Sequence, residues 1–233
     1  MIQNPSGVPT SQVGATAATD TSQRFLTHAF GWMFAGLLLT AGVATVVQSS
    51  QTLTSFALQN FLILILAQLG LVIAISAGIS RLSATAALGL FFVYAASLGL
   101  TVGLIVQAYT GASVAVAFLS ASAMFGGAAL YGALTHRSLA GLGGILMMGL
   151  IGVIVASLVN LFLQSSTVSW VISIAGVVIF TALTAFDVQR IQSGVLARAT
   201  GSVEKAAVLG ALQLYLDFVN LFLFLLRLTG GRR

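Results

Sequence analysis

Three long intervals of this chain contain no charged residue, and they constrain its fold more than any other feature. The intervals are residues 25–80, 82–136 and 138–186. Each is about twice the roughly 20 residues that a helix needs to cross a bilayer. Each also has a polar break near its middle, at Gln48–Ser55, Gln107–Ser113 and Gln164–Ser169. The pattern therefore predicts three hairpins, each made of two transmembrane helices joined by an uncharged turn.

The composition supports a membrane protein rather than a soluble one. Hydrophobic residues make up 58% of the chain and charged residues 6%, whereas soluble domains carry about 25% charged residues. A further apolar stretch follows near the C-terminus. We therefore predict an all-α, polytopic membrane protein with seven transmembrane helices. The predicted spans are residues 25–47, 56–79, 88–106, 114–134, 139–163, 168–186 and 206–226.

Basic residues lie at every second junction between these spans. They are Arg24, Arg81, Arg137 and the group Arg190, Arg198 and Lys205. Cytoplasmic loops are enriched in Lys and Arg, so the N-terminus is predicted to be cytoplasmic and the C-terminus to lie outside. Arg227 and the two terminal arginines do not fit an outside C-terminus, because the same rule would place them in the cytoplasm. A last helix that does not fully cross stays an alternative, although residues 206–226 are long enough to cross.

Several other classes of protein are excluded or disfavoured. The net charge of +5 comes from scattered basic residues, which indicate topology rather than binding to nucleic acid. The chain has no cysteine, so disulfides and thiolate chemistry are excluded. Residues 1–23 are rich in Ser, Thr and Ala and are predicted to be a disordered cytoplasmic tail, followed by a transmembrane domain over 24–230. The motif Gly99-x-x-x-Gly103 favours close helix packing inside one bundle, and Gly152-x-x-x-Ala156 has the same spacing.

Two acidic residues stand out because the chain has only four. Asp217 lies near the middle of the last apolar stretch, and Asp187 closes the stretch before it. A charged side chain at membrane depth costs roughly 2.5–3.5 kcal/mol on insertion scales, so such a residue needs a partner or a function. Two acids on consecutive helices suggest one shared site.

Helical spacing predicts that both acids face the interior of the bundle. Gln213, Asp217 and Asn220 form one polar stripe, and Thr184 lies one turn before Asp187. The helix of Asp187 is predicted to continue to about residue 197, with a turn at 201 and a new helix from about 203. At 1.5 Å per residue, Asp187 and Asp217 then lie roughly 15 and 20 Å from the cytoplasmic end, so they can meet.

A pair of this kind is expected to be sensitive to protons. Two carboxylates cannot both ionise cheaply in a desolvated site, so Asp187 and Asp217 are expected to titrate as a coupled pair. Sharing one proton, they would link two helices through a hydrogen bond. Fully ionised, they would form an oxygen-rich site that suits a hard cation such as Ca²⁺. A purely structural link between the last two helices stays an alternative. Arg81 and Arg190 are both candidates to pair with Asp187.

The two acidic segments also resemble a known family. Thr184–Ile191 (TAFDVQRI) and Leu214–Gly230 (LYLDFVNLFLFLLRLTG) are similar to the closing signature of the Bax inhibitor-1 family, also called the transmembrane Bax inhibitor motif family. The resemblance covers about residues 20–230. It implies six helices around a central seventh and a pH-sensitive calcium leak. It also implies that Asp187 and Asp217 form a pH-sensing pair and that Arg81 is a latch for that pair.

The chain departs from the family pattern at a few positions. Phe186 replaces a tyrosine that often precedes the first aspartate, and Gln68 stands where an acidic residue is common. These differences bear on the gating pH and the affinity for cations.

The functional prediction is therefore a cation leak rather than an enzyme. Protonation of the Asp187–Asp217 pair, with movement of Arg81, would set the balance between closed and open states. No cofactor is expected, and Ca²⁺ would be the permeant or transiently bound ion. Two alternatives stay open: a proton-coupled transporter, and an intramembrane aspartyl protease with one aspartate as general acid and one as base. We expect a monomer in a bacterial inner membrane, with lipid, protons and Ca²⁺ as its partners and no nucleic acid.

Overall fold

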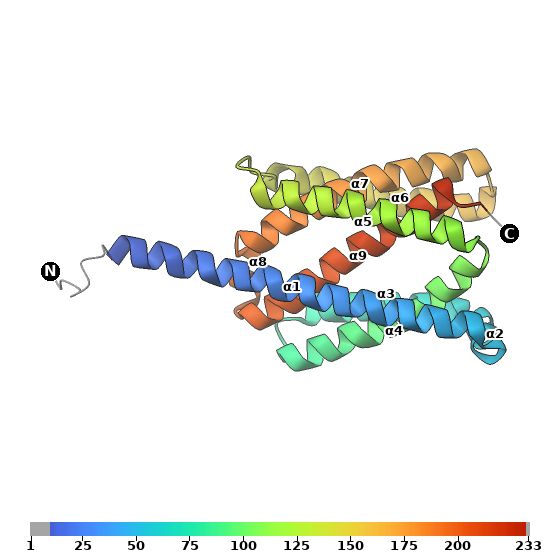
Figure 1. Ribbon diagram of the computed structural model, residues 1–233, viewed down its shortest axis with the longest axis horizontal. Coiled ribbons are helices and arrows are strands. Elements are labelled where there is room, and N and C mark those ends of the chain that lie inside the picture. Colours follow the sequence, from blue (N-terminus) through green and yellow to red (C-terminus); the bar gives the residue numbers. More distant parts are fainter. Residues whose placement is uncertain (1–9, 232–233) are drawn as a thin grey trace.

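The structure, a computed structural model, describes residues 10–231, with side chains from Phe25 onward. The described part is an all-α bundle with seven helices that are long and apolar enough to cross a membrane (Figure 1). In chain order the helices are α1 (Thr10–Ser49), α2 (Gln51–Gln59), α3 (Phe61–Gly78), α4 (Ala84–Gln107), α5 (Gly111–Leu134), the 3-10 turn η1 (Ala140–Leu142), α6 (Gly143–Leu163), α7 (Ser166–Gln192), α8 (Val195–Thr200) and α9 (Val203–Thr229).

All seven predicted spans are confirmed as helices, and two of the shifts at their ends have a clear structural reason. The second span begins at Phe61 rather than 56, because the short helix α2 occupies the polar turn before it. The sixth continues past 186 to Gln192, but it does not reach 197 as expected. Gly194 adopts a positive φ of 69° and breaks the helix, so residues 195–200 form the separate helix α8. The predicted turn at Gly201 and the start of the last helix at Val203 are confirmed.

Hydroxyl side chains mark where many of these helices begin. In each case the side-chain oxygen accepts a hydrogen bond from a backbone N–H in the first turn, which would otherwise have no partner. The N-cap residues that act in this way are Ser50, Ser83, Thr110, Ser165 and Ser202. The polar breaks in the sequence therefore end one helix and cap the next.

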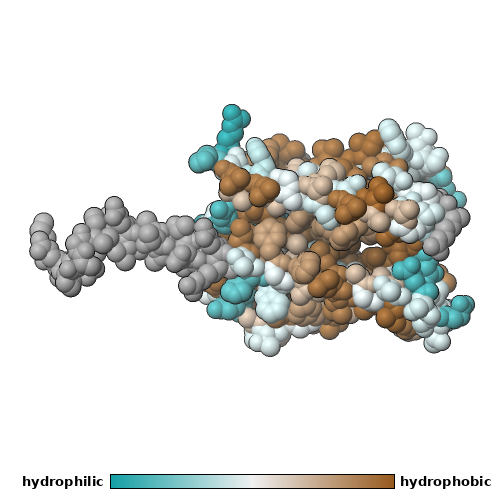
Figure 2. All heavy atoms as spheres, in the orientation of Figure 1, coloured by the Kyte–Doolittle hydropathy of each residue, from teal (hydrophilic) through white to brown (hydrophobic). Residues whose placement is uncertain are grey.

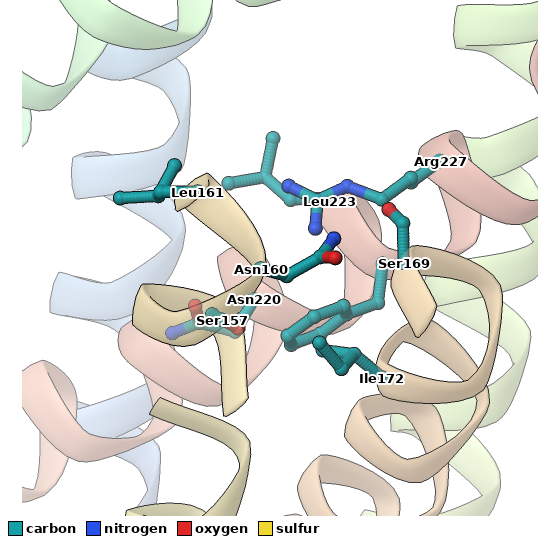
Figure 3. Close-up of a pocket in the computed structure, with 9 residues that line it drawn as sticks. Ser157, Asn160, Leu161, Ser169, Ile172, Asn220, Leu223 and Arg227 are labelled. Carbon is teal, nitrogen blue, oxygen red and sulfur yellow. The ribbon is translucent and has the colours of Figure 1, made fainter. Parts of the chain in front are cut away.

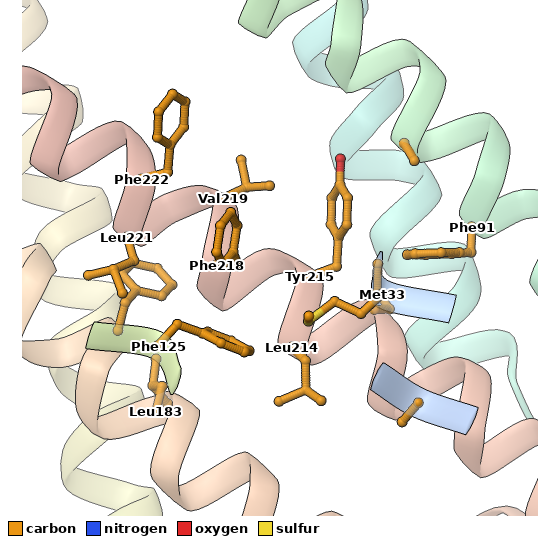
Figure 4. Close-up of a cluster of buried hydrophobic side chains, with 14 of the residues drawn as sticks. Met33, Phe91, Phe125, Leu183, Leu214, Tyr215, Phe218, Val219, Leu221 and Phe222 are labelled. Carbon is orange, nitrogen blue, oxygen red and sulfur yellow. The ribbon is translucent and has the colours of Figure 1, made fainter. Parts of the chain in front are cut away.

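The last helix, α9, is the central one, as the resemblance implied. It has the largest buried share of the seven spans and packs against α1, α5 and α7. Its own Tyr215 and Phe218, together with side chains of neighbouring helices such as Phe125 on α5, form the apolar core (Figure 4). Of the six helices expected to surround α9, α6 is an exception, because it packs against α7 and not closely against α9.

Helix α9 crosses the whole bundle. Near its start, the Lys205 Nζ atom donates to the backbone oxygen of Ser80, at the α3–α4 turn. Beyond its end, the Gly231 N–H donates to Ser113 Oγ in the first turn of α5, and the Gly231 backbone oxygen accepts from the N–H of Thr110, at the α4–α5 turn. These two turns lie at opposite ends of α4, so α9 runs the full length of a span (Figure 1). The structure therefore favours a complete seventh crossing over a partial one.

The surface pattern fits a bilayer. Apolar side chains form a broad belt around the middle of the bundle, and polar side chains gather toward its two ends (Figure 2). Many large apolar residues on α3 and α6 are exposed, as expected for helices that face lipid. Of the predicted disordered tail over residues 1–23, residues 1–9 lie outside the described part of the chain. Residues 10–23 belong to α1 instead of a disordered segment, and the cytoplasmic location of the tail stays a prediction.

One of the two small-residue motifs packs inside the bundle. A Cβ atom at Gly99 would lie 2.6 Å from the Val43 Cβ, and one at Gly103 would lie 2.8 Å from the Val47 Cβ. The absence of side chains at these two glycines therefore lets α4 approach α1 closely, as predicted. Gly152, from the second motif, faces open space instead.

Candidate functional site: an acid pair at the base of a membrane cavity

Asp187 and Asp217 are brought together, as the sequence predicted. Asp187 lies on α7 and Asp217 on α9, and these two helices pack along each other. Asp187 is 7% exposed and Asp217 is 4% exposed. Their charges are close enough to interact, and both residues line one cavity. The geometry therefore joins two buried acids from neighbouring helices in a single site.

The cavity around the acid pair has a volume of about 660 Å³. Its walls come from α3, α4, α6, α7 and α9, and they are mainly leucine, valine, phenylalanine and other apolar residues. The polar side chains that line it include Gln68, Ser157, Gln213 and Asn220. Ligand cavities in proteins have this general character, with apolar walls and a few converging polar groups.

Within the part of the chain that the structure describes, two oxygen atoms at this site have no hydrogen-bond partner. They are Asp217 Oδ2 and Gln213 Oε1, one helical turn apart on α9, and both atoms are buried. Among the described residues, no hydrogen bond joins Asp187 to Asp217. Buried polar atoms are usually paired, and an unpaired one costs about 1–3 kcal/mol. The site therefore offers free acceptor atoms and not a completed link between helices.

The three supporting polar residues differ in their roles. Gln213 and Asn220 line the cavity with the acids, as predicted. Asn220 donates from Nδ2 to the Leu216 backbone oxygen at 2.8 Å, which leaves its side-chain oxygen available. Thr184 is fully buried and donates to the Phe180 backbone oxygen at 2.8 Å, within its own helix. It is not among the residues that line the cavity.

The arginine that the structure places at the site is Arg190, and not Arg81. Arg190 lines the cavity one turn beyond Asp187, and its charge acts on that carboxyl group. Arg81 is exposed on the α3–α4 turn and is not among the residues that line the cavity. The sequence left both arginines open as partners of Asp187, because spacing along the chain does not show which turn folds inward.

Sequence reasoning missed some of the residues that hold the site in place. The Tyr215 hydroxyl is hydrogen-bonded to Thr40 Oγ1, which also donates to the Ala95 backbone oxygen at 2.8 Å, so α1, α4 and α9 are tied together. On the other side, the Gln189 side chain accepts from the Leu139 N–H at 2.7 Å and fixes the segment before α6 to α7. The sequence shows that Thr40, Tyr215 and Gln189 are polar residues in apolar helices, but it does not show which groups on other helices they bond to.

Gln68, which stands where the family often has an acidic residue, bonds one helix to another. Its Nε2 atom donates to Thr101 Oγ1 at 2.8 Å and to the Ser97 backbone oxygen at 3.0 Å, so it ties α3 to α4 at the cavity wall. An acidic residue here would have no proton to donate when ionised. The glutamine therefore satisfies the Ser97 backbone oxygen, which an ionised carboxylate would repel.

Smaller cavities continue from this site toward the opposite end of α7. A cavity of about 380 Å³ shares Ser157, Leu161, Asn220 and Phe224 with the larger one, and it reaches Arg227 (Figure 3). A third cavity, of about 450 Å³, lies beside Arg227, Ser165 and Gln164 at the α6–α7 turn. Because they share residues, the cavities lie next to one another, in a series from the acid pair toward the end of the bundle that the charge rule places outside.

Comparison with known proteins agrees with this architecture. The model of the family described as inhibitor of apoptosis-promoting Bax1 matches residues 22–233. The chain belongs to the Bax inhibitor-1 family. It is 46% identical over 217 residues to the inner membrane protein YbhL of Escherichia coli strain K12, covering 91% of this chain and 93% of that protein. It is also 43% identical to an uncharacterized protein of Borreliella burgdorferi, with 90% and 93% covered.

A relative from Deinococcus radiodurans, also uncharacterized, is 41% identical over 214 residues. These matches span almost the whole chain, so the family resemblance seen in its last segments extends to all seven spans. Together with the seven apolar helices, they identify an integral, multi-pass membrane protein. The names of these relatives mention no enzyme activity.

Proposed function

We propose that this protein is a pH-sensitive leak for cations, with Ca²⁺ as the main permeant ion, and that the Asp187–Asp217 pair controls it. The observation that carries the proposal is that two buried acids line one cavity, beside unpaired acceptor oxygens of Asp217 and Gln213. Membership in the Bax inhibitor-1 family supports it.

The charges at the site suggest how protons would act. When both acids are ionised they attract a cation, and the oxygens of Gln213 and Asn220 can help to replace its water ligands. A proton bound by the pair lowers this attraction and competes with the cation. We therefore propose that the leak increases as pH rises and the shared proton is lost.

Calcium is proposed as a passing ion. The described residues contain no group of three or more His, Cys, Asp or Glu side chains, whereas Ca²⁺ in proteins takes six to eight oxygen ligands. Two carboxylates with two amides form a weaker site than that. Weak binding suits permeation, because an ion that binds too tightly does not leave.

A route through the protein is suggested by the linked cavities. Asn220 and Ser157 line both the cavity of the acid pair and the neighbouring cavity that reaches Arg227, near the end of α9. Polar side chains along this route could replace part of the hydration of an ion. Arg81, which lies apart from the pair in this structure, would act as a latch only after a rearrangement of the α3–α4 turn.

The proposal is tested by Ca²⁺ flux into reconstituted vesicles between pH 5 and 8. Wild type should show a leak that grows with pH, and Asp187→Asn and Asp217→Asn should each change its size and its dependence on pH. Glu204→Gln is a matched control, because Glu204 is an exposed acid at the start of α9. An unaltered pH profile in both aspartate variants would rule the mechanism out.

A proton-coupled transporter is the second candidate, and the size of the main cavity favours it. A volume of about 660 Å³ is large enough for a small organic solute as well as an ion. Counter-flow separates the two functions: a transporter accelerates uptake of labelled solute when unlabelled solute is inside the vesicle, whereas a leak does not. We propose no enzyme activity.

A further inference from the structure

The main cavity opens sideways, toward lipid. Helix α3 packs against α4, and α6 packs against α7, but within the described residues α3 and α6 do not pack closely against each other. Three of the apolar residues on these helices that line the cavity, Leu69, Met147 and Leu161, are 56%, 54% and 68% exposed. Apolar side chains that are exposed at membrane depth face acyl chains and not water.

The same cavity is lined by the buried acid pair and by exposed apolar side chains. Asp187 and Asp217 are buried, whereas Leu69, Met147 and Leu161 are more than half exposed. A molecule already dissolved in the bilayer could therefore enter without crossing water. Its apolar body would contact leucine and methionine side chains, and its polar head would reach the acids.

The unpaired oxygen atoms beside the acids determine which polar head group a ligand of this cavity can carry. Asp217 Oδ2 and Gln213 Oε1 are buried acceptors without a donor. A matching ligand must supply N–H or O–H donors, and a positive charge would also offset the acids. Of the described residues that line the cavity, Arg190 is the one with a basic side chain; it lies one turn from Asp187 and acts on that acid. Asp217 is therefore the acid that is left for a ligand.

We infer that this cavity binds amphipathic primary amines in their protonated form, taken up from the bilayer. The ammonium group would donate hydrogen bonds to Asp217 Oδ2 and Gln213 Oε1, and the alkyl chain would lie in the apolar gap between α3 and α6. A volume of about 660 Å³ accommodates a chain of this kind. An amine bound there would also stand in the proposed path of the cation.

Binding is tested directly, by native mass spectrometry of the purified protein and by its thermal stability in lipid nanodiscs. The probes are dodecylamine, dodecyltrimethylammonium and dodecanol. The three share an alkyl chain, but only the first combines a positive charge with N–H donors. Dodecylamine should bind at least about tenfold more tightly than either of the others, which corresponds to one charge-assisted hydrogen bond. It alone should raise the melting temperature at low concentration.

Two variants locate the site. Asp217→Asn should weaken dodecylamine binding by about tenfold or more, and Gln213→Leu should weaken it several-fold while leaving both acids in place. Glu204→Gln removes an exposed acid from the same helix and should leave binding unchanged. If Asp217→Asn does not fold, Gln213→Leu alone decides the question.

The inference is overturned if the three probes bind equally well, since that would mean simple partitioning of alkyl chains into the lipid-facing surface. It is also overturned if Glu204→Gln weakens binding as much as Gln213→Leu does. Because binding is measured without ion flux, a protein that shows no calcium leak can still bind the amine. The two proposals therefore fail separately.

Discussion

Replacing Asp217 with asparagine tests whether the acid pair serves function or stability. The two side chains have nearly the same shape, so the change removes the charge and little else. Asp217 is 4% exposed, and its Oδ2 atom accepts no hydrogen bond. A buried acceptor without a partner costs about 1–3 kcal/mol. A buried acid beside a second acid should therefore destabilise the protein in which it lies.

Asparagine should relieve this cost. Its amide group provides two N–H donors, and Gln213, one turn earlier on α9, has an unpaired Oε1. The neutral side chain also no longer repels Asp187. We therefore expect Asp217→Asn to raise the free energy of unfolding by about 1–3 kcal/mol, while the pH-dependent leak is lost.

The stability change can be measured by equilibrium unfolding in mixed detergent micelles at pH 7, followed by circular dichroism. Glu204→Gln again serves as the control and should differ little from wild type, because Glu204 is exposed. The opposite outcome, a loss of about 1 kcal/mol or more in Asp217→Asn, would show that the pair holds α7 and α9 together. That result would refute the view that the acids are retained for function at the expense of stability.

Further substitutions test the packing around the site and the roles of the two arginines. Tyr215→Phe removes the hydroxyl bonded to Thr40 and should lower the free energy of unfolding by about 0.5–1.5 kcal/mol in the same assay. Gly99→Ala should lower it by about 1–3 kcal/mol, because the new methyl group overlaps α1; Gly152→Ala, which faces open space, should not. In vesicles, Arg190→Gln should move the pH midpoint of the leak upward, because loss of a nearby positive charge makes the ionised pair costlier. Arg81→Gln should move it less, and an equal or larger shift would restore Arg81 as the arginine that controls the pair.

The comparison between prediction and structure is clearest at the helix ends. The break between the sixth span and the last helix was expected at Gly201 alone, but Gly194 also adopts a left-handed conformation and starts a separate short helix. Apolar positions at Val195 and nearby gave no sign of this, since a short surface helix and a continued span have the same pattern. Hydrophobic periodicity indicates which face of a helix is buried, but it does not indicate every position at which the helix breaks.

The sequence by itself determined the number of spans, the fold class and the presence of two acids on consecutive membrane helices. These follow from local physics: a charge-free apolar stretch of sufficient length has to be a membrane helix, and a buried acid in such a stretch is costly enough to be noticed. Only the tertiary structure decided which arginine lies beside the acids, that Thr184 bonds within its own helix, and that a cavity opens between α3 and α6. Those features depend on how helices from distant parts of the chain pack together, and spacing along a single helix carries no information about its neighbours.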